Sequence, residues 1–198
     1  MEFSCSPVVN EYVKSNILKF SQISIDEFLI FDTPVQRAAF RSFSPERKFE
    51  IWSEKLKKVL YFETWTDQEA KHINDLINHL CIEYFMEGEK YDSIKIENRI
   101  FAGNWIDYAI NKLKWDKRKL AFVVSSLHIS FAEYEYSLSR LRDVKAIASE
   151  NTETNCDCNT GADFCNYEPG STCSSTGCKA SSSGCGWLWM EECNGNCI

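Results

Sequence analysis

The distribution of cysteine constrains this chain more than any other feature of its sequence. Eight of the ten cysteines lie between Cys156 and Cys197, with the spacing C-x-C-x6-C-x7-C-x4-C-x6-C-x7-C-x3-C. The surrounding residues are mostly polar, and residues 151–198 hold few large apolar side chains. A segment this short and polar cannot bury enough apolar surface to fold on a core alone. We therefore expect it to be held together by disulfides.

An even number of cysteines predicts that all eight pair. The predicted disulfide framework comprises Cys156, Cys158, Cys165, Cys173, Cys178, Cys185, Cys193 and Cys197. Each disulfide stabilises a small domain by about 2 to 4 kcal/mol, so four could hold the segment. Eight cysteines allow about 105 pairings, and the sequence leaves the connectivity open. Such a framework persists only under oxidising conditions, which predicts an extracytoplasmic protein, secreted or anchored at the outer surface.

The first residues bear on export. Residues 1–10 lack the basic start and apolar stretch of a signal peptide, so we expect none in the chain as given. Ser4-Cys5 is similar to the end of a lipoprotein processing site, which makes Cys5 a candidate for lipidation; alternatively it is an unpaired thiol near a frayed terminus. The longest apolar run, residues 121–130, is interrupted by polar side chains and is too short to span a membrane.

Residues 1–145 contain only two of the ten cysteines, and their apolar residues recur at helical spacing. We expect them to form an α-helical bundle. Thr33 and Ser44 each precede a proline and are typical N-caps, and Thr66 with Glu69 has the spacing of a capping box. The third of these helices is expected to end at Gly88, and a further helix is expected over residues 93–113. A seam of apolar residues predicts one last, long helix over 116–148. This seam comprises Leu120, Val124, Leu127, Phe131, Tyr134, Leu138 and Leu141.

The fold class is therefore mainly α, with a small disulfide-rich C-terminal domain. Residues 146–155 have no periodicity and are predicted to form an exposed linker. Residues 156–198 are predicted to form a separate module with little regular structure or short β-hairpins. A processing protease could cut the linker, or the module could stay tethered; the sequence leaves both open.

The sequence gives less support to metal binding or catalysis. A four-thiolate zinc site could be drawn from Cys156, Cys158, Cys193 and Cys197. The segment has no histidine and no C-x2-C pair, however, and such a site would leave four thiols unexplained. We thus expect neither a metal nor another cofactor. No common catalytic motif occurs in the chain, which argues against an enzyme.

The three histidines could be taken for ligands of a di-iron site. Glu69 and His72 have the required Glu-x-x-His spacing, but the second such pair is missing, since positions 76 and 125 are Leu and Ser. We expect His72, His79 and His128 to be ordinary residues on helix surfaces.

The charge of the C-terminal segment limits its partners. Residues 151–198 contain six acidic residues and one lysine, a net charge of −5. This argues against nucleic-acid binding and against polybasic attraction to anionic lipid. Four large apolar residues follow Gly186: Trp187, Leu188, Trp189 and Met190. They are candidates for contact with a membrane or target, because tryptophan favours the bilayer interface. Alternatively they form the module's own small core.

Three motifs of the segment suggest a family. Cys-Asp-Cys-Asn at 156–159, Ser-Ser-Ser-Gly-Cys-Gly-Trp-Leu-Trp at 181–189 and the Cys193-x3-Cys197 spacing resemble the bacteriocin fulvocin C-related proteins. In the helical part the resemblance extends to a softer pattern over residues 34–58. It implies an exported helical region followed by an antibacterial, membrane-directed peptide with four disulfides.

Two functions follow as expectations. The first is a bacteriocin-like precursor, whose helical domain keeps the peptide inactive until cleavage releases it against the membrane or an envelope receptor of competitor cells. The second is a surface lipoprotein that displays a disulfide-rich, non-enzymatic binding module. A third reading, thioether rings formed between the cysteines and serine or threonine, is disfavoured because a folded leader of this length would be atypical.

Overall fold

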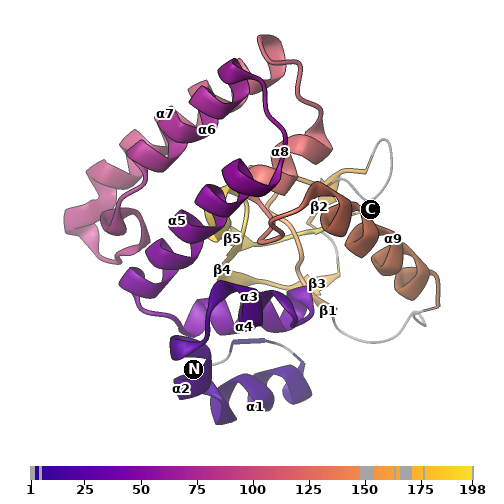
Figure 1. Cartoon of the computed structure of the whole chain (residues 1–198). Helices are drawn as coiled ribbons and strands as arrows, with labels where there is room; N and C mark the ends of the chain where they lie inside the picture. Colours follow the sequence, from indigo (N-terminus) through magenta and orange to yellow (C-terminus); the bar gives the residue numbers. More distant parts are fainter. Residues whose placement is uncertain are drawn as a thin grey trace.

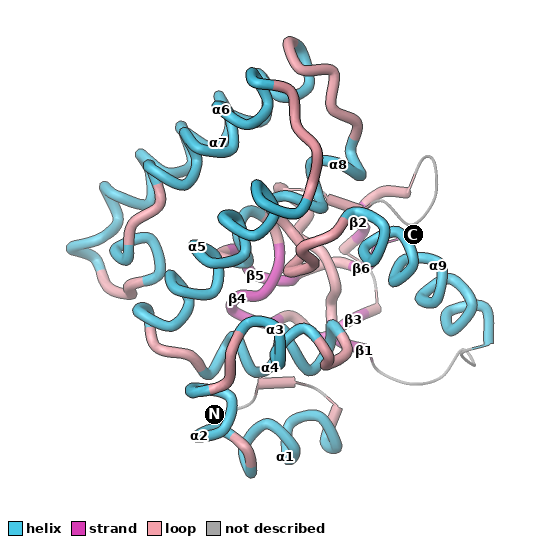
Figure 2. The backbone as a smooth tube through the Cα atoms, viewed as in Figure 1, coloured by secondary structure: helices cyan, strands magenta, loops and turns pink. Residues whose placement is uncertain are grey.

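The computed structural model of the chain describes residues 3–4, 6–147, 154–162, 164–165, 171–175 and 177–197 (Figure 1). Helices dominate the part before the cysteine-rich segment (Figure 2). The α-helices are α1 Pro7–Ser15, α2 Ile17–Gln22, α3 Ile25–Leu29, α4 Thr33–Ser42, α5 Pro45–Phe62, α6 Asp67–His79, α7 Asp92–Asn111, α8 Lys117–Val124 and α9 Phe131–Ile147. Two 3-10 helices, η1 Ile82–Phe85 and η2 Glu89–Tyr91, connect α6 to α7.

The capping signals act largely as predicted. Ser44 caps α5, and its side chain accepts a hydrogen bond from the amide of Arg47. Thr66 and Glu69 form the predicted capping box of α6. For α4 the N-cap lies one residue earlier than predicted, at Asp32. The Ser44 and Thr66 side chains place the starts of α5 and α6, because they satisfy amides that the first turn of a helix leaves unpaired, whereas Asp32 makes no such hydrogen bond at the start of α4.

Two predicted helices end earlier than expected. The helix that begins at Asp67 ends at His79, because Leu80 is already extended, and Gly88 lies beyond η1 with φ 110°. The helix expected over residues 116–148 is broken into α8 and α9. A side chain from elsewhere in the chain binds the last carbonyls of α8: Lys55 donates to the carbonyls of Phe122 and Val123. The break thus has a tertiary cause that the apolar seam does not reveal.

The cysteine-rich segment is built from short strands and four disulfides, in agreement with the predicted fold class. The strands are β1 Thr154–Asn155, β2 Cys173–Ser174, β3 Cys178–Lys179, β4 Ser181–Cys185, β5 Glu191–Cys193 and β6 Asn196–Cys197. They pair two by two: β1 with β3 in parallel, and β2 with β6 and β4 with β5 in antiparallel. The β4–β5 pair is a hairpin whose loop holds the 3-10 helix η3 Trp187–Trp189.

The segment does not project from the helices. Figures 1 and 2 show β4 and β5 lying between α4 on one side and α5 and α8 on the other. Trp187, Leu188 and Trp189 belong to the same buried apolar cluster as the residues of the helices. A second, small cluster of Cys156, Cys185 and Cys193 lies within the segment itself. The helices and the hairpin loop therefore share one core.

Residues 148–153, the middle of the predicted linker, lie outside the described residues, so an exposed linker stays a prediction. The two ends of the predicted linker, residues 146–147 and 154–155, belong to α9 and β1. Within the described part of the chain, no helix is both long enough and apolar enough to cross a membrane.

Candidate functional site

The loop of the β4–β5 hairpin is the centre of the candidate site. Gly186, Leu188 and Trp189 have φ angles of 68°, 50° and 56°. The left-handed region suits glycine but costs other residues about 1 to 2 kcal/mol each. The surrounding contacts must hold Leu188 and Trp189 in this conformation. Both side chains are buried, with exposed fractions of 0% and 1%.

Trp189 joins the hairpin to several of the helices. Its ring meets those of Phe40 on α4 and Trp52 on α5 edge to face, with centroids 5.4 and 6.0 Å apart. The indole Nε1 donates a hydrogen bond of 2.9 Å to the carbonyl of Ser125, directly after α8. The ring is thus buried between three helices, and its polar atom is paired.

Trp187 and Met190 contact α7. The ring of Trp187 lies edge to face with that of Trp105, at a centroid distance of 5.4 Å. The sulfur of Met190 accepts a 3.5 Å contact from the side-chain amide of Asn98. Of the four candidate contact residues, Trp187, Leu188 and Trp189 are therefore buried against the helices, and Met190 is partly buried beside them. The three buried residues form neither an exposed surface in this structure nor a core confined to the cysteine-rich segment.

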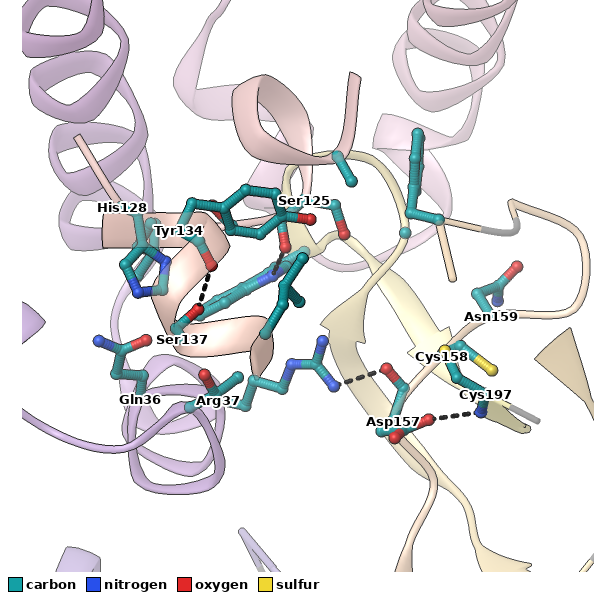
Figure 3. Close-up of a pocket in the computed structure, with 18 of the residues that line it drawn as sticks. Gln36, Arg37, Ser125, His128, Tyr134, Ser137, Asp157, Cys158, Asn159 and Cys197 are labelled. Carbon is teal, nitrogen blue, oxygen red and sulfur yellow. Dashed lines mark hydrogen bonds between the residues drawn. The ribbon is translucent and has the colours of Figure 1, made fainter. Parts of the chain in front are cut away.

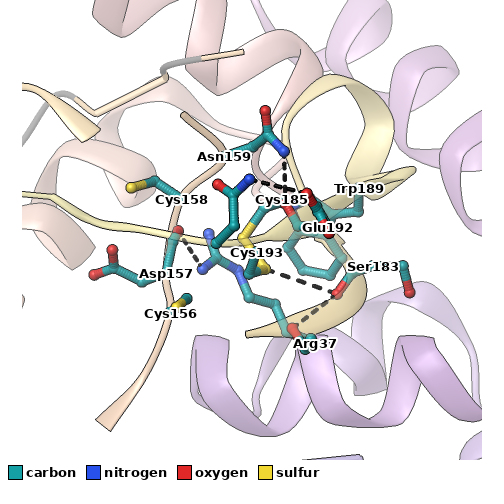
Figure 4. Close-up of a disulfide and its surroundings, with 12 residues drawn as sticks. Arg37, Cys156, Asp157, Cys158, Asn159, Ser183, Cys185, Trp189, Glu192 and Cys193 are labelled. Atoms are coloured by element: carbon teal, nitrogen blue, oxygen red, sulfur yellow. Dashed lines mark hydrogen bonds between the residues drawn. A yellow bond between two sulfur atoms is a disulfide. The ribbon is translucent and has the colours of Figure 1, made fainter. Parts of the chain in front are cut away.

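Two arginines of α4 bind the backbone of the cysteine-rich segment. Arg37 donates to the carbonyl of Asp157 at 2.6 Å, and its guanidinium lies 5.8 Å from the centroid of the Trp189 ring (Figure 4). Arg41 donates to the carbonyl of Ser183 at 2.6 Å. Since the two arginines are four residues apart, they share one face of α4. Their cationic side chains face a segment of net negative charge.

A close approach at Gly184 reinforces this contact. A Cβ atom at this position would lie 2.9 Å from Nη2 of Arg41, and the glycine has φ 104°. The positive φ favours glycine here, and a larger side chain would also displace the guanidinium of Arg41. Sequence reasoning did not single out Arg37 or Arg41. The available signal was a pair of cations at i, i+4 on one helix, in a chain whose C-terminal segment is acidic.

All eight cysteines of the segment are paired, as their even number predicted. The disulfides are Cys156–Cys178, Cys158–Cys173, Cys165–Cys197 and Cys185–Cys193. The last of them joins the two strands of the hairpin, close to Trp189 (Figure 4). The four cysteines of the alternative zinc site belong to four different disulfides. Cys5, the lipidation candidate, lies outside the described residues.

A buried lysine lies between α5 and the end of α8, and sequence reasoning missed it. Lys55 on α5 is fully buried, and its Nζ donates to two carbonyls at the end of α8 at 2.6 and 2.5 Å. Burial lowers the pKa of Lys55 well below its usual range. No carboxylate contacts Nζ among the described residues. A cation suits the C-terminal end of a helix, where partial negative charge gathers.

A cavity of about 60 Å³ lies among α4, α8, α9 and the cysteine-rich segment (Figure 3). His128, Tyr134, Arg37, Asp157 and Trp189 are among the residues that line it. The Nδ1 atom of His128 is inaccessible to solvent and has no hydrogen-bond partner among the described residues. Burial, and then the charge of Lys55, lower the pKa of His128 to about 4.

The expectation that the histidines lie on helix surfaces is wrong for two of them. His72 is buried and stacks on Trp105, with ring centroids 4.1 Å apart, and its Nε2 pairs with the carbonyl of Trp105. His128 lies in a loop between α8 and α9 and not on a helix. Glu69, the partner in the half-motif, accepts hydrogen bonds from Trp115 and Lys119. Aromatic packing thus explains the position of His72.

We expect His128 to make the fold sensitive to mild acid. Its pKa falls from about 6.5 in the unfolded chain to about 4 in the folded one, so the unfolded state binds the proton more tightly. The contribution of neutral His128 to the free energy of unfolding is fully present above pH 6.5. It is lost as the pH falls towards 4, and the free energy of unfolding is then lower by about 3 kcal/mol. Urea unfolding measured at pH 7.5 and pH 4.5 should show this loss.

The His128→Gln variant isolates this contribution, because His72 and His79 also have lowered pKa values, mainly through burial. The variant should lose less stability than the natural chain between pH 7.5 and 4.5. An equal loss in both proteins would contradict the assignment. The pKa of Glu69 is lowered to about 2, so protonation of this carboxylate reduces stability only at lower pH. Burial raises its pKa, but hydrogen bonds, led by that from Lys119, outweigh this effect.

No protein-family model matches this chain, and no curated protein or solved structure matches it either.

Proposed function

We propose that this chain is a bacteriocin-like antibacterial precursor, in which the helices hold the four-disulfide segment in a latent state. The observation that supports this proposal is the burial of Trp187, Leu188 and Trp189 within the core of the helices. These residues are the segment's strongest candidates for contact with a target membrane or envelope receptor. While they are buried, they cannot reach such a target. The four disulfides are consistent with a role outside the cytoplasm.

In this proposal the helical part acts as an intramolecular inhibitor. Trp189 fills a site between Phe40 and Trp52. Arg37 binds the backbone carbonyl of Asp157, and Arg41 binds that of Ser183 on β4. Four disulfides keep the segment compact after it leaves the helices, so it can be both stored and released folded. The proposal assigns no catalytic reaction to the chain.

Proteolysis within residues 146–155 should therefore leave the segment bound. Cutting the backbone there removes none of the contacts of Trp189, Arg37 or Arg41 described above. A nicked chain should still elute as one species in native size-exclusion chromatography and should separate in denaturant without reductant. Activation then requires cleavage and a second event that displaces the hairpin loop, such as contact with a membrane.

The test is a chain with a specific protease site inserted after Asn151. Intact and nicked protein, and the isolated oxidised fragment, are each added to dye-loaded liposomes and to cultures of related bacteria. The proposal predicts that the fragment causes leakage or growth inhibition, that the intact chain is inactive, and that the nicked complex is weaker than the fragment. A fragment without activity in both assays would remove the main support for a toxin.

A second candidate, a surface lipoprotein, is favoured by exposed apolar side chains on the first two helices. Val8 and Leu18 have exposed fractions of 79% and 76% and lie within 13 residues of Cys5 in the sequence. A lipidated Cys5 would bring this part of the chain to a membrane surface. Intact mass of the native protein distinguishes the two candidates, because lipidation adds mass at the N-terminus whereas processing yields a free C-terminal fragment.

A further inference from the structure

A large groove lies between α7, the start of α8 and the cysteine-rich segment. Its volume is about 790 Å³. Sites for small organic ligands typically have volumes of about 300 to 1,000 Å³. Along α7 the lining extends from Arg99 to Ile110, which is about 16 Å of helix. The groove is therefore large enough and long enough for an extended hydrocarbon chain.

The lining of this groove is mostly apolar and comes from both parts of the chain. Ile106 and Ile110 belong to α7 and Leu120 to α8, whereas Phe164 and Trp187 belong to the cysteine-rich segment. Ile110 is 44% exposed, so part of this apolar surface is in contact with solvent. An apolar ligand would remove that surface from water. Because the helices and the segment both supply lining residues, the groove exists only while they are assembled.

Trp187 connects the groove to the buried hairpin loop. Its side chain is 4% exposed, and its indole Nε1 has no hydrogen-bond partner within the part of the chain that the structure describes. The Nε1 of Trp189, by contrast, donates to the carbonyl of Ser125. Aromatic packing therefore holds the ring of Trp187, and the ring can shift as a ligand enters the groove without breaking a hydrogen bond of Nε1.

The charged residues of the lining favour an anionic head group. Among the lining residues that the structure describes they are two cations, Arg99 and Lys117, and one carboxylate, Glu191, so the net charge is +1. Arg99 already pairs with Glu191, at 3.7 Å. Lys117 donates to a neutral group, the carbonyl of Ser171, at 3.1 Å. Lys117 is thus the cation to which a ligand carboxylate would add a charge-assisted hydrogen bond.

We propose that this groove binds one fatty acid, with its carboxylate at Lys117 and its hydrocarbon chain along α7, against Ile106 and Trp187. A ligand that binds only the assembled chain stabilises it by mass action, so the fatty acid holds the cysteine-rich segment on the helices. The site depends on the shared core alone and not on whether the segment is antibacterial.

The test titrates the full oxidised chain with decanoate, below its micelle concentration, in a calorimeter. We expect one decanoate per chain, and a thermal unfolding midpoint that rises with decanoate concentration. Decanol has the same hydrocarbon chain but no charge, and it should bind about tenfold more weakly because it lacks the charge-assisted hydrogen bond. Lys117→Gln should remove this preference and bind the two ligands equally. A natural chain without the preference would contradict the place of the carboxylate.

Gly103→Leu is the variant that fills the groove. Gly103 lies in the lining on α7, and a Cβ atom added there would meet no atom within 4 Å. Leucine also favours a helix more than glycine does, so the variant should fold. It should bind decanoate at least about tenfold more weakly, since its side chain takes the place of the ligand. Asn104→Leu, at the next and exposed position of α7 outside the lining, is the matched control and should bind as the natural chain does.

Equal affinity of the Gly103→Leu and Asn104→Leu variants would overturn the proposal, as would binding of decanoate only above its micelle concentration. A last arm separates a free fatty acid from a membrane lipid. The natural chain is incubated with anionic phospholipid vesicles that contain decanoate, separated from them, and extracted for mass spectrometry. Decanoate should be recovered with the protein; recovery of phospholipid instead, or of neither, would contradict a fatty-acid site.

Discussion

Replacing Trp189 with alanine should lower the free energy of unfolding of the whole chain by about 3 to 5 kcal/mol. The substitution empties the site between Phe40 and Trp52 and leaves the carbonyl of Ser125 without its hydrogen bond. It also leaves Leu188 in a left-handed conformation with less packing to hold it. Urea unfolding followed by far-ultraviolet circular dichroism measures the change. Because this signal reports the helices, a large shift would show that the hairpin stabilises them.

Tyr61→Ala is the control for this prediction. Tyr61 lies on α5, as Trp52 does, but is 83% exposed, so its removal should change stability by no more than about 0.5 kcal/mol. A Trp189→Ala protein as stable as the Tyr61→Ala protein would mean that the hairpin loop is not part of the core. The latent state proposed above would then lose its physical basis.

Removing the Cys185–Cys193 disulfide, by changing both residues to serine, should lower the free energy of unfolding by about 2 to 5 kcal/mol. Both cysteines are buried, and the bond joins the two strands of the hairpin whose loop contains Trp187–Trp189. Without it the unfolded chain gains conformational freedom, and the left-handed loop loses its anchor. The helical signal should shift in urea together with the tryptophan fluorescence, since the two report one core.

Cys81→Ser provides the matched cysteine control. Cys81 is a free, half-buried thiol between α6 and η1, and its change to serine should lower stability by less than about 1 kcal/mol. If the double variant of Cys185 and Cys193 shifted the fluorescence but left the helical transition unchanged, the helices and the cysteine-rich segment would be independent folding units. That outcome would favour the separate module expected from the sequence.

Local signals in the sequence identify much of the fold. Ser44 and Thr66 mark helix starts because a helix N-cap depends on a few neighbouring residues. The even number of cysteines predicts that a framework exists, but its pairing depends on which cysteines the folded backbone brings within bonding distance. The break between α8 and α9 was missed because the groups that bind the carbonyls at the end of α8, Lys55 and Trp189, are distant in sequence.

The sequence by itself determined that this chain has a helical part and an acidic, disulfide-stapled C-terminal segment, since composition and spacing are properties of the chain. Only the tertiary structure decided where Trp187, Leu188 and Trp189 are buried. An apolar run can pack on its own disulfides, on a membrane or on helices more than 100 residues earlier in the chain, and the sequence is the same in each case. In the folded chain the run packs on the helices, because the site between Phe40 and Trp52 buries the Trp189 ring while its Nε1 donates a hydrogen bond to the carbonyl of Ser125.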